Sequence, residues 1–179
     1  MIKRIIRAYI KRFGSPERYG KLIGVKIGKN CDIQNVSFGS EPYLITIGNH
    51  VQITNGTKIF THGGVWVFRN QYPIMDFFGK VLIKNNAYIG NNSMIMPGVT
   101  IGNDVIIGAG SVVTKSIPDG KIAAGNPARI VGETKDFVEK IKHYDVGSKG
   151  MSYEEKRKYL LSLPENKFIQ KPLMKIHES

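Results

Sequence analysis

Residues 83–117 read IKNNAYIGNNSMIMPGVTIGNDVIIGAGSVVTKSI, and an aliphatic side chain stands at every sixth position of this stretch. A second set of small or β-branched residues follows four positions after each of these. The first set is Ile83, Ile89, Ile95, Ile101, Ile107 and Val113, and the second is Ala87, Ser93, Val99, Val105, Ser111 and Ile117. A period of six fits neither the 3.6-residue turn of an α-helix nor the two-residue alternation of a strand. The pattern therefore indicates one short strand and one tight turn, repeated.

This repeat predicts an all-β solenoid. Three six-residue units close a triangular coil, and successive coils pair at the usual strand spacing of about 4.8 Å. The first position of each unit points inward, and so does the fifth, near a corner where only a small or β-branched side chain fits. Glycine and asparagine mark the turns, where positive φ is needed. The register also occurs at Ile27, Cys31 and Ile33 and at Ile47, Val51, Ile53, Thr57 and Ile59. An ordinary β-sandwich would not predict so strict a register, so the β-helix is favoured.

The chain is basic, with 26 Lys and Arg against 14 Asp and Glu in 179 residues and a net charge of +12. Residues 1–30 hold nine basic residues and one acidic residue, so the excess is concentrated there. Such a segment is either a solvated helix face or the contact for an anionic partner, such as a phosphate-bearing ligand or a membrane surface. An RNA-binding aromatic motif, a Cys/His finger and a recognition helix are all absent from the sequence, so no nucleic-acid partner is expected.

Cysteine content and hydropathy exclude further classes. Cys31 is the only cysteine, which rules out an internal disulfide and a multi-cysteine zinc site. The sequence has no run of about 18 apolar residues that could span a membrane. Charges interrupt every apolar pair of the first residues, MIKRIIRAYIKRF, so this segment does not match a signal peptide. We therefore expect a cytoplasmic protein.

Two segments break the six-residue register, and breaks in a repeat are where function usually resides. The first is FGSEPYL, residues 38–44, and the second is WVFRNQYPIMDFFGK, residues 66–80. The second contains one Trp, one Tyr and three Phe. It predicts a loop that leaves the coil and either packs against protein or forms one wall of a substrate cleft.

His62 is the candidate general base. His50 and His62 both stand at the fourth position of a hexapeptide, which does not point inward. His50 lies in an uninterrupted turn and is expected to be exposed. His62 lies in FTHGGVW, directly before the aromatic loop, which could fold over the imidazole and exclude water. An imidazole is a natural base near neutral pH, and a packing role for His62 is the alternative.

The stretch GVTIGNDVIIGAGSVVTKSIPDGKIAAGNPARIVG, residues 98–132, resembles the end of the acetyl-CoA-binding coil of the hexapeptide-repeat acyltransferases. Its AGNPA motif is among the more specific features of that family. The resemblance implies a left-handed parallel β-helix, acetyl-CoA as acetyl donor, no metal, and a homotrimer with active sites between subunits. FGSEPYLITIG, FTHGGVW and SYEEK are more similar to the polysaccharide O-acetyltransferase branch. That branch implies a saccharide acceptor, in capsule, exopolysaccharide or O-antigen synthesis.

The same resemblance implies the site residues. His62 takes the proton of the acceptor hydroxyl, the oxygen attacks the thioester directly, and the backbone N–H of Asn91 stabilises the oxyanion. Tyr88 stands where the family often has Trp, and Glu41 or Asp76 is a candidate to orient His62. Carried over by position, the residues that bind the cofactor are Asn91, Ala109, Thr114, Lys115 and Arg129.

Three segments are expected: an N-terminal helical cap over 1–24, the catalytic β-helix over 25–132 with its loop at 66–80, and a C-terminal helical extension over 133–179. Within 2–13, apolar residues follow helical spacing with basic residues between them. This amphipathic helix either caps the first coil or makes a peripheral contact with an anionic membrane. Ser152 and Glu155 predict a capping box, and the helix that it starts continues until Pro164.

Three other functions are weighed against O-acetylation. An N-acetyltransferase acting on an amino-sugar nucleotide would depend less on His62, because a neutral amine needs less help from a base. A γ-carbonic anhydrase needs three convergent histidines, and only His50 and His62 lie in the repeat. A non-catalytic solenoid is disfavoured by the cofactor-binding motif.

Overall fold

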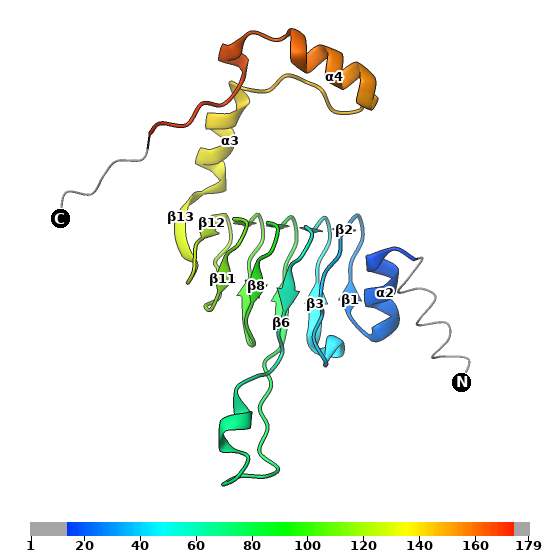
Figure 1. The fold of residues 1–179 in the computed structure, drawn as a ribbon, viewed down its shortest axis with the longest axis vertical. Coiled ribbons are helices and arrows are strands. Elements are labelled where there is room, and N and C mark those ends of the chain that lie inside the picture. The colour runs from blue at the N-terminus through cyan, green and yellow to red at the C-terminus, as the bar shows by residue number, and fades with distance from the viewer. Residues whose placement is uncertain (1–13, 174–179) are drawn as a thin grey trace, which may run out of the picture. The chain divides into compact units, whose positions relative to one another are not determined.

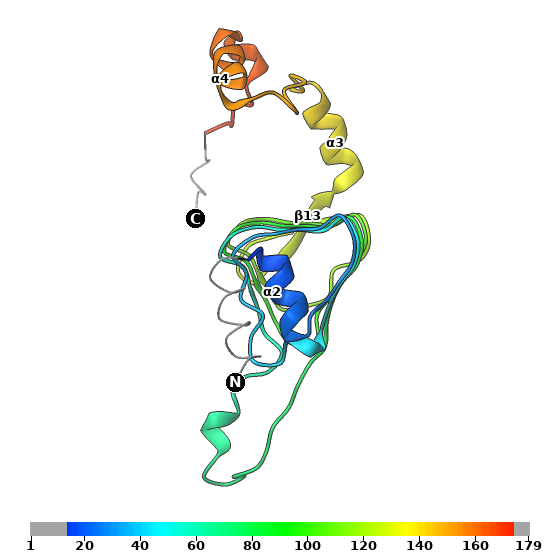
Figure 2. The ribbon, with the colours of Figure 1, turned by 90° about the vertical axis from the view of Figure 1, so that its right-hand side faces the viewer.

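The structure is a computed structural model in which residues 14–173 are described. Its main body is a parallel β-helix of triangular cross-section (Figures 1 and 2). The first sheet contains β1 (Lys26–Ile27), β3 (Ile45–Ile47), β6 (Val81–Ile83) and β9 (Thr100–Ile101). The second contains β2 (Asp32–Ile33), β4 (Gln52–Ile53), β7 (Tyr88–Ile89), β10 (Ile106–Ile107), β12 (Lys121–Ala124) and β13 (Arg129–Glu133), and the third contains β5 (Lys58–Ile59), β8 (Met94–Ile95) and β11 (Val112–Val113).

The pairing follows the predicted repeat. Neighbouring strands in each sheet come from successive coils and run parallel, except for the antiparallel pair β12 and β13 at the C-terminal end. Within the long uninterrupted stretch, Ile83 pairs with Ile101 and Ile89 with Ile107, each 18 residues on. Three hexapeptides therefore make one coil, as the sequence predicts.

Both inward series are confirmed. Every residue of the two sets between Ile83 and Ile117 is at most 6% exposed. Ser93 and Ser111 tolerate this burial because their hydroxyls donate to the carbonyls of Gly90 (2.7 Å) and Gly108 (2.6 Å). Cys31, in the first coil, is partly buried against the same core. The interior therefore holds aliphatic side chains and small residues whose polar atoms are satisfied.

A ladder of side-chain amides stacks along the corner between the first and second sheets. The backbone N–H of Asn49 donates to the Asn85 side chain, that of Asn85 to Asn103, and that of Asn103 to Asp119, at 2.9–3.1 Å. The hydrogen bonds from the side chain and backbone of Asn103 lower the pKa of Asp119. Each coil thus fixes the turn of the next through the same repeated hydrogen bonds.

His50 lies at the same corner and is exposed, as predicted. Its backbone has φ of 54°, and its Nδ1 lies 2.7 Å from the amide oxygen of Asn86. The contact extends a second ladder of turn residues and brings His50 near no other histidine of the described chain.

Helix α2 (Pro16–Ile23) lies across the open N-terminal end of the coil (Figure 2). Ser15 caps it by accepting a hydrogen bond from the N–H of Arg18, and Pro16 occupies its first turn. Gly20 is buried, and a Cβ there would meet Phe38 at 3.0 Å and Ile27 at 3.1 Å. This close approach seals the first coil. The amphipathic helix expected over 2–13 lies outside the described residues.

The described residues after Thr134 belong to a second compact unit. The C-terminal segments are α3 (Thr134–Lys142), α4 (Tyr153–Ser162) and the short 3₁₀ helix η3 (Glu165–Lys167). The predicted capping box is confirmed: the N–H of Glu155 donates to the Ser152 hydroxyl, and the N–H of Ser152 donates to the Glu155 carboxylate. Over residues 14–173, every helix is too short or too polar to cross a lipid bilayer.

Replacing an inward isoleucine should cost far more stability than replacing its outward neighbour. Ile107 is fully buried, whereas Ile106 of the same strand is partly exposed. We expect Ile107→Ala to lower the free energy of unfolding by about 2–5 kcal/mol, through lost burial and the cavity left behind. Ile106→Ala should lower it by about 1 kcal/mol or less. Urea denaturation followed by circular dichroism measures both, and equal losses would contradict the inward assignment.

Candidate functional site

The chain leaves the coil after β5 and returns at Gly79. The N–H of Gly79 donates to the carbonyl of Thr61 at 2.7 Å, which closes the base of the excursion. A Cβ at Gly79 would lie 2.3 Å from the backbone nitrogen of Gly98, so only glycine fits at this return. The loop between these two residues projects from one corner of the coil (Figures 1 and 2). The predicted excursion from the register is thus present.

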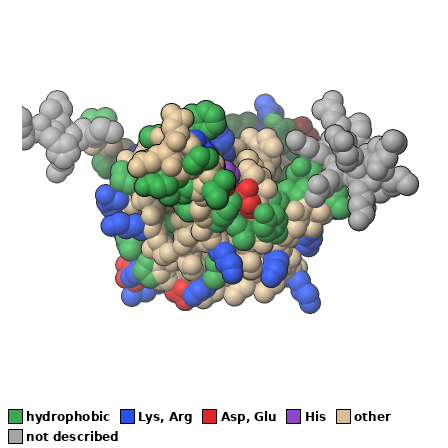
Figure 3. Space-filling model, turned by 90° about the horizontal axis from the view of Figure 1, so that it is seen from below, with side chains coloured by type: hydrophobic (Ala, Val, Ile, Leu, Met, Phe, Trp, Pro, Cys, Tyr) green, Lys and Arg blue, Asp and Glu red, His purple; other side chains and the backbone are tan. Residues whose placement is uncertain are grey.

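The loop carries its own internal contacts and a large exposed apolar surface. It begins with the 3₁₀ helix η2 (Val65–Phe68), and the guanidinium of Arg69 donates to the carbonyl of Pro73 at 3.1 Å and lies 3.9 Å from the Asp76 carboxylate. Trp66 is 86% exposed and Ile74 is 96% exposed. Apolar side chains gather on this side of the molecule (Figure 3). A single chain therefore leaves the loop without a surface to pack on.

His62 stands at the base of this loop, and the first register break reaches it. Its Nε2 lies 3.3 Å from the Ser40 hydroxyl and 3.4 Å from a carboxylate oxygen of Glu41. Thr61 donates to the same Glu41 oxygen at 2.7 Å. The Phe78 ring lies 5.7 Å from the imidazole, centre to centre, and forms an apolar wall. Two segments that break the repeat in different coils thus meet at one imidazole.

Burial and charge fit this group for proton transfer. The His62 side chain is 39% exposed, so a substrate can reach it, whereas that of Glu41 is only 15% exposed. With its proton on Nε2, the imidazole can donate toward the Glu41 carboxylate, which only accepts hydrogen bonds when ionised, and Nδ1 is then the acceptor. Of the two acids considered from sequence, Glu41 contacts His62, whereas Asp76 contacts Arg69. No cluster of three metal-ligating side chains occurs in residues 14–173.

The contacts of Ser40 and Thr61 were not predicted from the sequence. The six-residue repeat predicts where each side chain lies within the coil. A segment that leaves the coil has no repeat, so its contacts cannot be predicted in this way. The one available signal was chemical, because the first break contains a single acid, Glu41, and the loop follows His62 almost at once.

The residues expected to bind the cofactor border the third sheet, β5–β8–β11. Asn91 and Ala109 precede β8 and β11, and they are neighbours, since the N–H of Gly110 donates to the Asn91 carbonyl at 2.7 Å. Thr114 and Lys115 follow β11 directly. All four are exposed. Two of these residues therefore lie at the N-terminal ends of the strands of the third sheet, and two lie at the C-terminal end of β11.

Arg129 and His62 are the two remaining predicted site residues. Arg129 is the first residue of β13, is exposed, and pairs in register with Ala124 of β12. His62 follows β5, and Thr114 and Lys115 follow β11, two strands away. All three therefore lie at the C-terminal ends of the strands of the third sheet. Asn91 and Ala109 lie at the opposite, N-terminal ends of these strands. One chain alone thus does not bring His62 and Asn91 together.

Comparisons with known proteins agree with the fold. The family model described as "Bacterial transferase hexapeptide (six repeats)" matches residues 80–115. Protein CapG of Staphylococcus aureus is 48% identical over 172 residues, which are 93% of this chain and 99% of that protein.

Two solved structures are also similar. A hexapeptide-repeat acetyltransferase from Vibrio cholerae has a TM-score of 0.60 at 24% identity, over 75% of this chain and 89% of that one, which shows the fold. A galactoside acetyltransferase in complex with coenzyme A has a TM-score of 0.51 at 29% identity, over 79% and 84%. These likenesses establish the left-handed hand of the coil that the resemblance implied. The chain therefore belongs to the hexapeptide-repeat transferase family, and it is an acetyl-CoA-dependent acetyltransferase.

Proposed function

We propose that this enzyme transfers the acetyl group of acetyl-CoA to a hydroxyl of a saccharide, in the synthesis of a capsule, exopolysaccharide or O-antigen. The observation that carries the proposal is the accessible imidazole of His62 backed by the carboxylate of Glu41 beside the third sheet. A hydroxyl needs a base to become a nucleophile, and this pair is built to supply one. The similarity to a galactoside acetyltransferase supports a sugar acceptor.

The donor lies along the third sheet in this proposal. Lys115 and Arg129 have no acidic partner among the described residues, so both cations are available to the phosphates of coenzyme A. Ala109 and Thr114 border the sheet where the pantetheine arm would pass. The N–H of Asn91 makes no hydrogen bond to any described group, which leaves it able to donate to the thioester carbonyl.

The reaction is a direct transfer. Nδ1 of His62 accepts the proton of the acceptor hydroxyl as its oxygen bonds to the thioester carbon. The N–H of Asn91 stabilises the oxyanion of the tetrahedral intermediate. The C–S bond then breaks, and the imidazolium returns its proton to the coenzyme A sulfur. Much of the rate comes from holding donor and acceptor together.

The assembly proposed is a homotrimer with each site between neighbouring chains. His62 and Asn91 lie at opposite ends of the strands of the third sheet in one chain. In the proposed trimer, His62 of one chain would face Asn91 of its neighbour. The exposed apolar loop would pack on that neighbour, which would bury residues such as Trp66 and Ile74. A screen of saccharide acceptors with acetyl-CoA, followed by free thiol release, tests the function as a whole.

Removing the base should abolish most turnover. We expect His62→Ala to lower kcat for a saccharide acceptor by at least about a hundredfold while acetyl-CoA binding stays nearly intact. The matched control is His50→Asn, which changes a histidine at the same hexapeptide position and tolerates the left-handed backbone there. Unchanged turnover in His62→Ala, or an equal loss in the control, would remove the base assignment.

Glu41 should act by positioning His62. We expect Glu41→Gln to lower kcat about tenfold without changing KM for acetyl-CoA, because the donor does not touch this carboxylate. ¹⁵N NMR of the imidazole should show that the preference for the Nε2-protonated tautomer is lost. Asp76→Asn, which changes the acid of the second break, should leave kcat and the tautomer preference as they are in the parent protein. A tautomer preference that survives in Glu41→Gln would contradict the positioning role.

Arg129 should hold a phosphate of the donor. Arg129→Ala should weaken coenzyme A binding about tenfold, as expected for the loss of a charge-assisted contact. Pantetheine, which lacks the nucleotide phosphates, should bind both proteins alike. Calorimetric titration measures both ligands, and equal coenzyme A affinity would show that Arg129 is ordinary surface charge.

A further inference from the structure

Phe78 and His62 extend from neighbouring points on one fixed piece of backbone. The N–H of Gly79, the residue after Phe78, donates to the carbonyl of Thr61, the residue before His62, at 2.7 Å. Gly79 also packs tightly on the next coil, where a Cβ would lie 2.3 Å from the backbone nitrogen of Gly98. The aromatic ring is therefore held beside the imidazole, and the two ring centres lie 5.7 Å apart.

The space beside this pair of rings is open. Phe78 is 52% exposed, and the His62 side chain is 39% exposed. Gly63 and Gly64 come directly after the imidazole, and a Cβ added to either of them would meet no atom within 4 Å. The two rings are close enough for one ligand to touch both. A ligand can therefore reach the imidazole while it rests on the aromatic ring.

Polar and apolar surfaces meet at this imidazole. The Ser40 hydroxyl and the Glu41 carboxylate lie 3.3 Å and 3.4 Å from Nε2 of His62, whereas Phe78 supplies an apolar face. Ligand sites commonly combine aromatic side chains with a few placed polar groups. A pyranose matches this combination, because it carries hydroxyls around its rim and C–H groups on its faces. Stacking on the aromatic ring would leave the rim hydroxyls free to meet the base.

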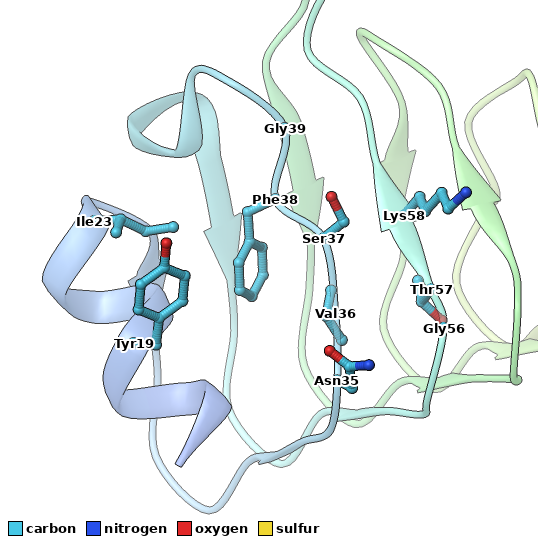
Figure 4. Close-up of a pocket in the computed structure, with 10 residues that line it drawn as sticks. All are labelled: Tyr19, Ile23, Asn35, Val36, Ser37, Phe38, Gly39, Gly56, Thr57 and Lys58. Carbon is cyan, nitrogen blue, oxygen red and sulfur yellow. The ribbon is translucent and has the colours of Figure 1, made fainter. Parts of the chain in front are cut away.

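The pocket between α2 and the first two coils is a poorer candidate for the sugar ring (Figure 4). It has a volume of about 400 Å³, but its Phe38 side chain is buried. The Lys58 side chain extends away from Tyr19 (Figure 4). None of its lining residues, all of which are described, forms a hydrogen bond, ion pair or ring contact with His62. The exposed aromatic ring beside the base is better placed for the reaction.

We propose that Phe78 selects a cyclic sugar: its ring stacks on a C–H face of the acceptor pyranose and so holds the attacking hydroxyl beside His62. The acceptor is thereby narrowed to a pyranose with an uninterrupted C–H face, since a hydroxyl directed at the aromatic ring would lose its hydrogen bonds. Phe78 lies at the base of the loop, so Trp66 and the rest of the exposed loop remain available to a neighbouring chain. The inference rests on the proposed function for the reaction, but the stacking contact can be measured without turnover.

The kinetic test compares a cyclic acceptor with an open-chain one. Methyl β-glucopyranoside presents C–H groups on both faces of its ring, whereas glucitol carries similar hydroxyls without a ring. Phe78→Leu should raise KM for the glucopyranoside about tenfold, because an aromatic contact is lost while an apolar side chain is kept. KM for glucitol, KM for acetyl-CoA and kcat should each change by less than about twofold. Phe78→Tyr, which keeps an aromatic ring, should retain the KM of the parent protein.

Phe77→Leu is the matched control. Phe77 precedes Phe78 and has the same exposed fraction, 52%, but the ring that contacts His62 is that of Phe78. This variant should leave KM for the glucopyranoside as it is in the parent protein. Equal rises in KM in both variants would reduce the effect to general apolar surface. A fall in kcat for both acceptors in Phe78→Leu would show that the ring only shields the base from water. Either result would overturn the proposal.

Saturation-transfer difference NMR of the full chain with methyl β-glucopyranoside measures the contact without acetyl transfer. Irradiation of aromatic protons should saturate the C–H protons of one sugar face more than those of the other. This difference should vanish in Phe78→Leu and persist in Phe77→Leu. A parent protein that binds glucitol as tightly as the glucopyranoside would also contradict the proposal.

Thiol release separates this inference from the proposed function. Binding of the glucopyranoside that depends on Phe78, with no transfer to any saccharide, would keep the stacking contact and reject the O-acetyltransferase. Transfer to pyranosides that Phe78→Leu leaves unchanged would keep the enzyme and reject the stacking contact.

Discussion

The stacking of one coil on the next constrains everything else in this protein. Each backbone amide of a strand bonds to the coil beside it, so the side chain at a given hexapeptide position lies on the same position of its neighbour. An inward position must then accept a side chain that packs on similar side chains, which admits Ile or Val in one column and small or β-branched residues in the other. A charged or catalytic group has no place inside such a column.

Function is therefore confined to the outer surface and to the breaks in the register. The two breaks lie one coil apart along the axis, and stacking brings Ser40 and Glu41 of the first break beside His62 at the base of the second. Glu41 comes from the first break and His62 from the base of the second, and Thr61, buried between them, bonds to the carboxylate. The regular coil thus holds the two irregular segments in contact with each other.

The same contrast explains what the sequence could predict. The fold followed from residues 83–117 alone, because a strict period states which side chains share a column. The exposed turn position of His50 followed from its place in that period, and so did the outward position of His62. The contact of His62 with Glu41 rather than Asp76 did not follow, because the path of an excursion depends on its own packing. Nor did the pocket, since it needs α2, whose packing on Phe38 through Gly20 carries no periodic signal.

The base and the cations proposed to hold the donor are separated along the axis, which suits a two-substrate reaction. The proposed donor cations, Lys115 and Arg129, stand in the last coils of the β-helix, whereas His62 stands in the second coil. A single shared surface would let coenzyme A compete with the acceptor. Lys115 follows β11 and His62 follows β5, two strands away in the third sheet, so an acceptor held on the N-terminal side of His62 would not meet the donor cations. The geometry therefore favours a ternary complex over sequential use of one site, which is what direct transfer without an acyl-enzyme requires.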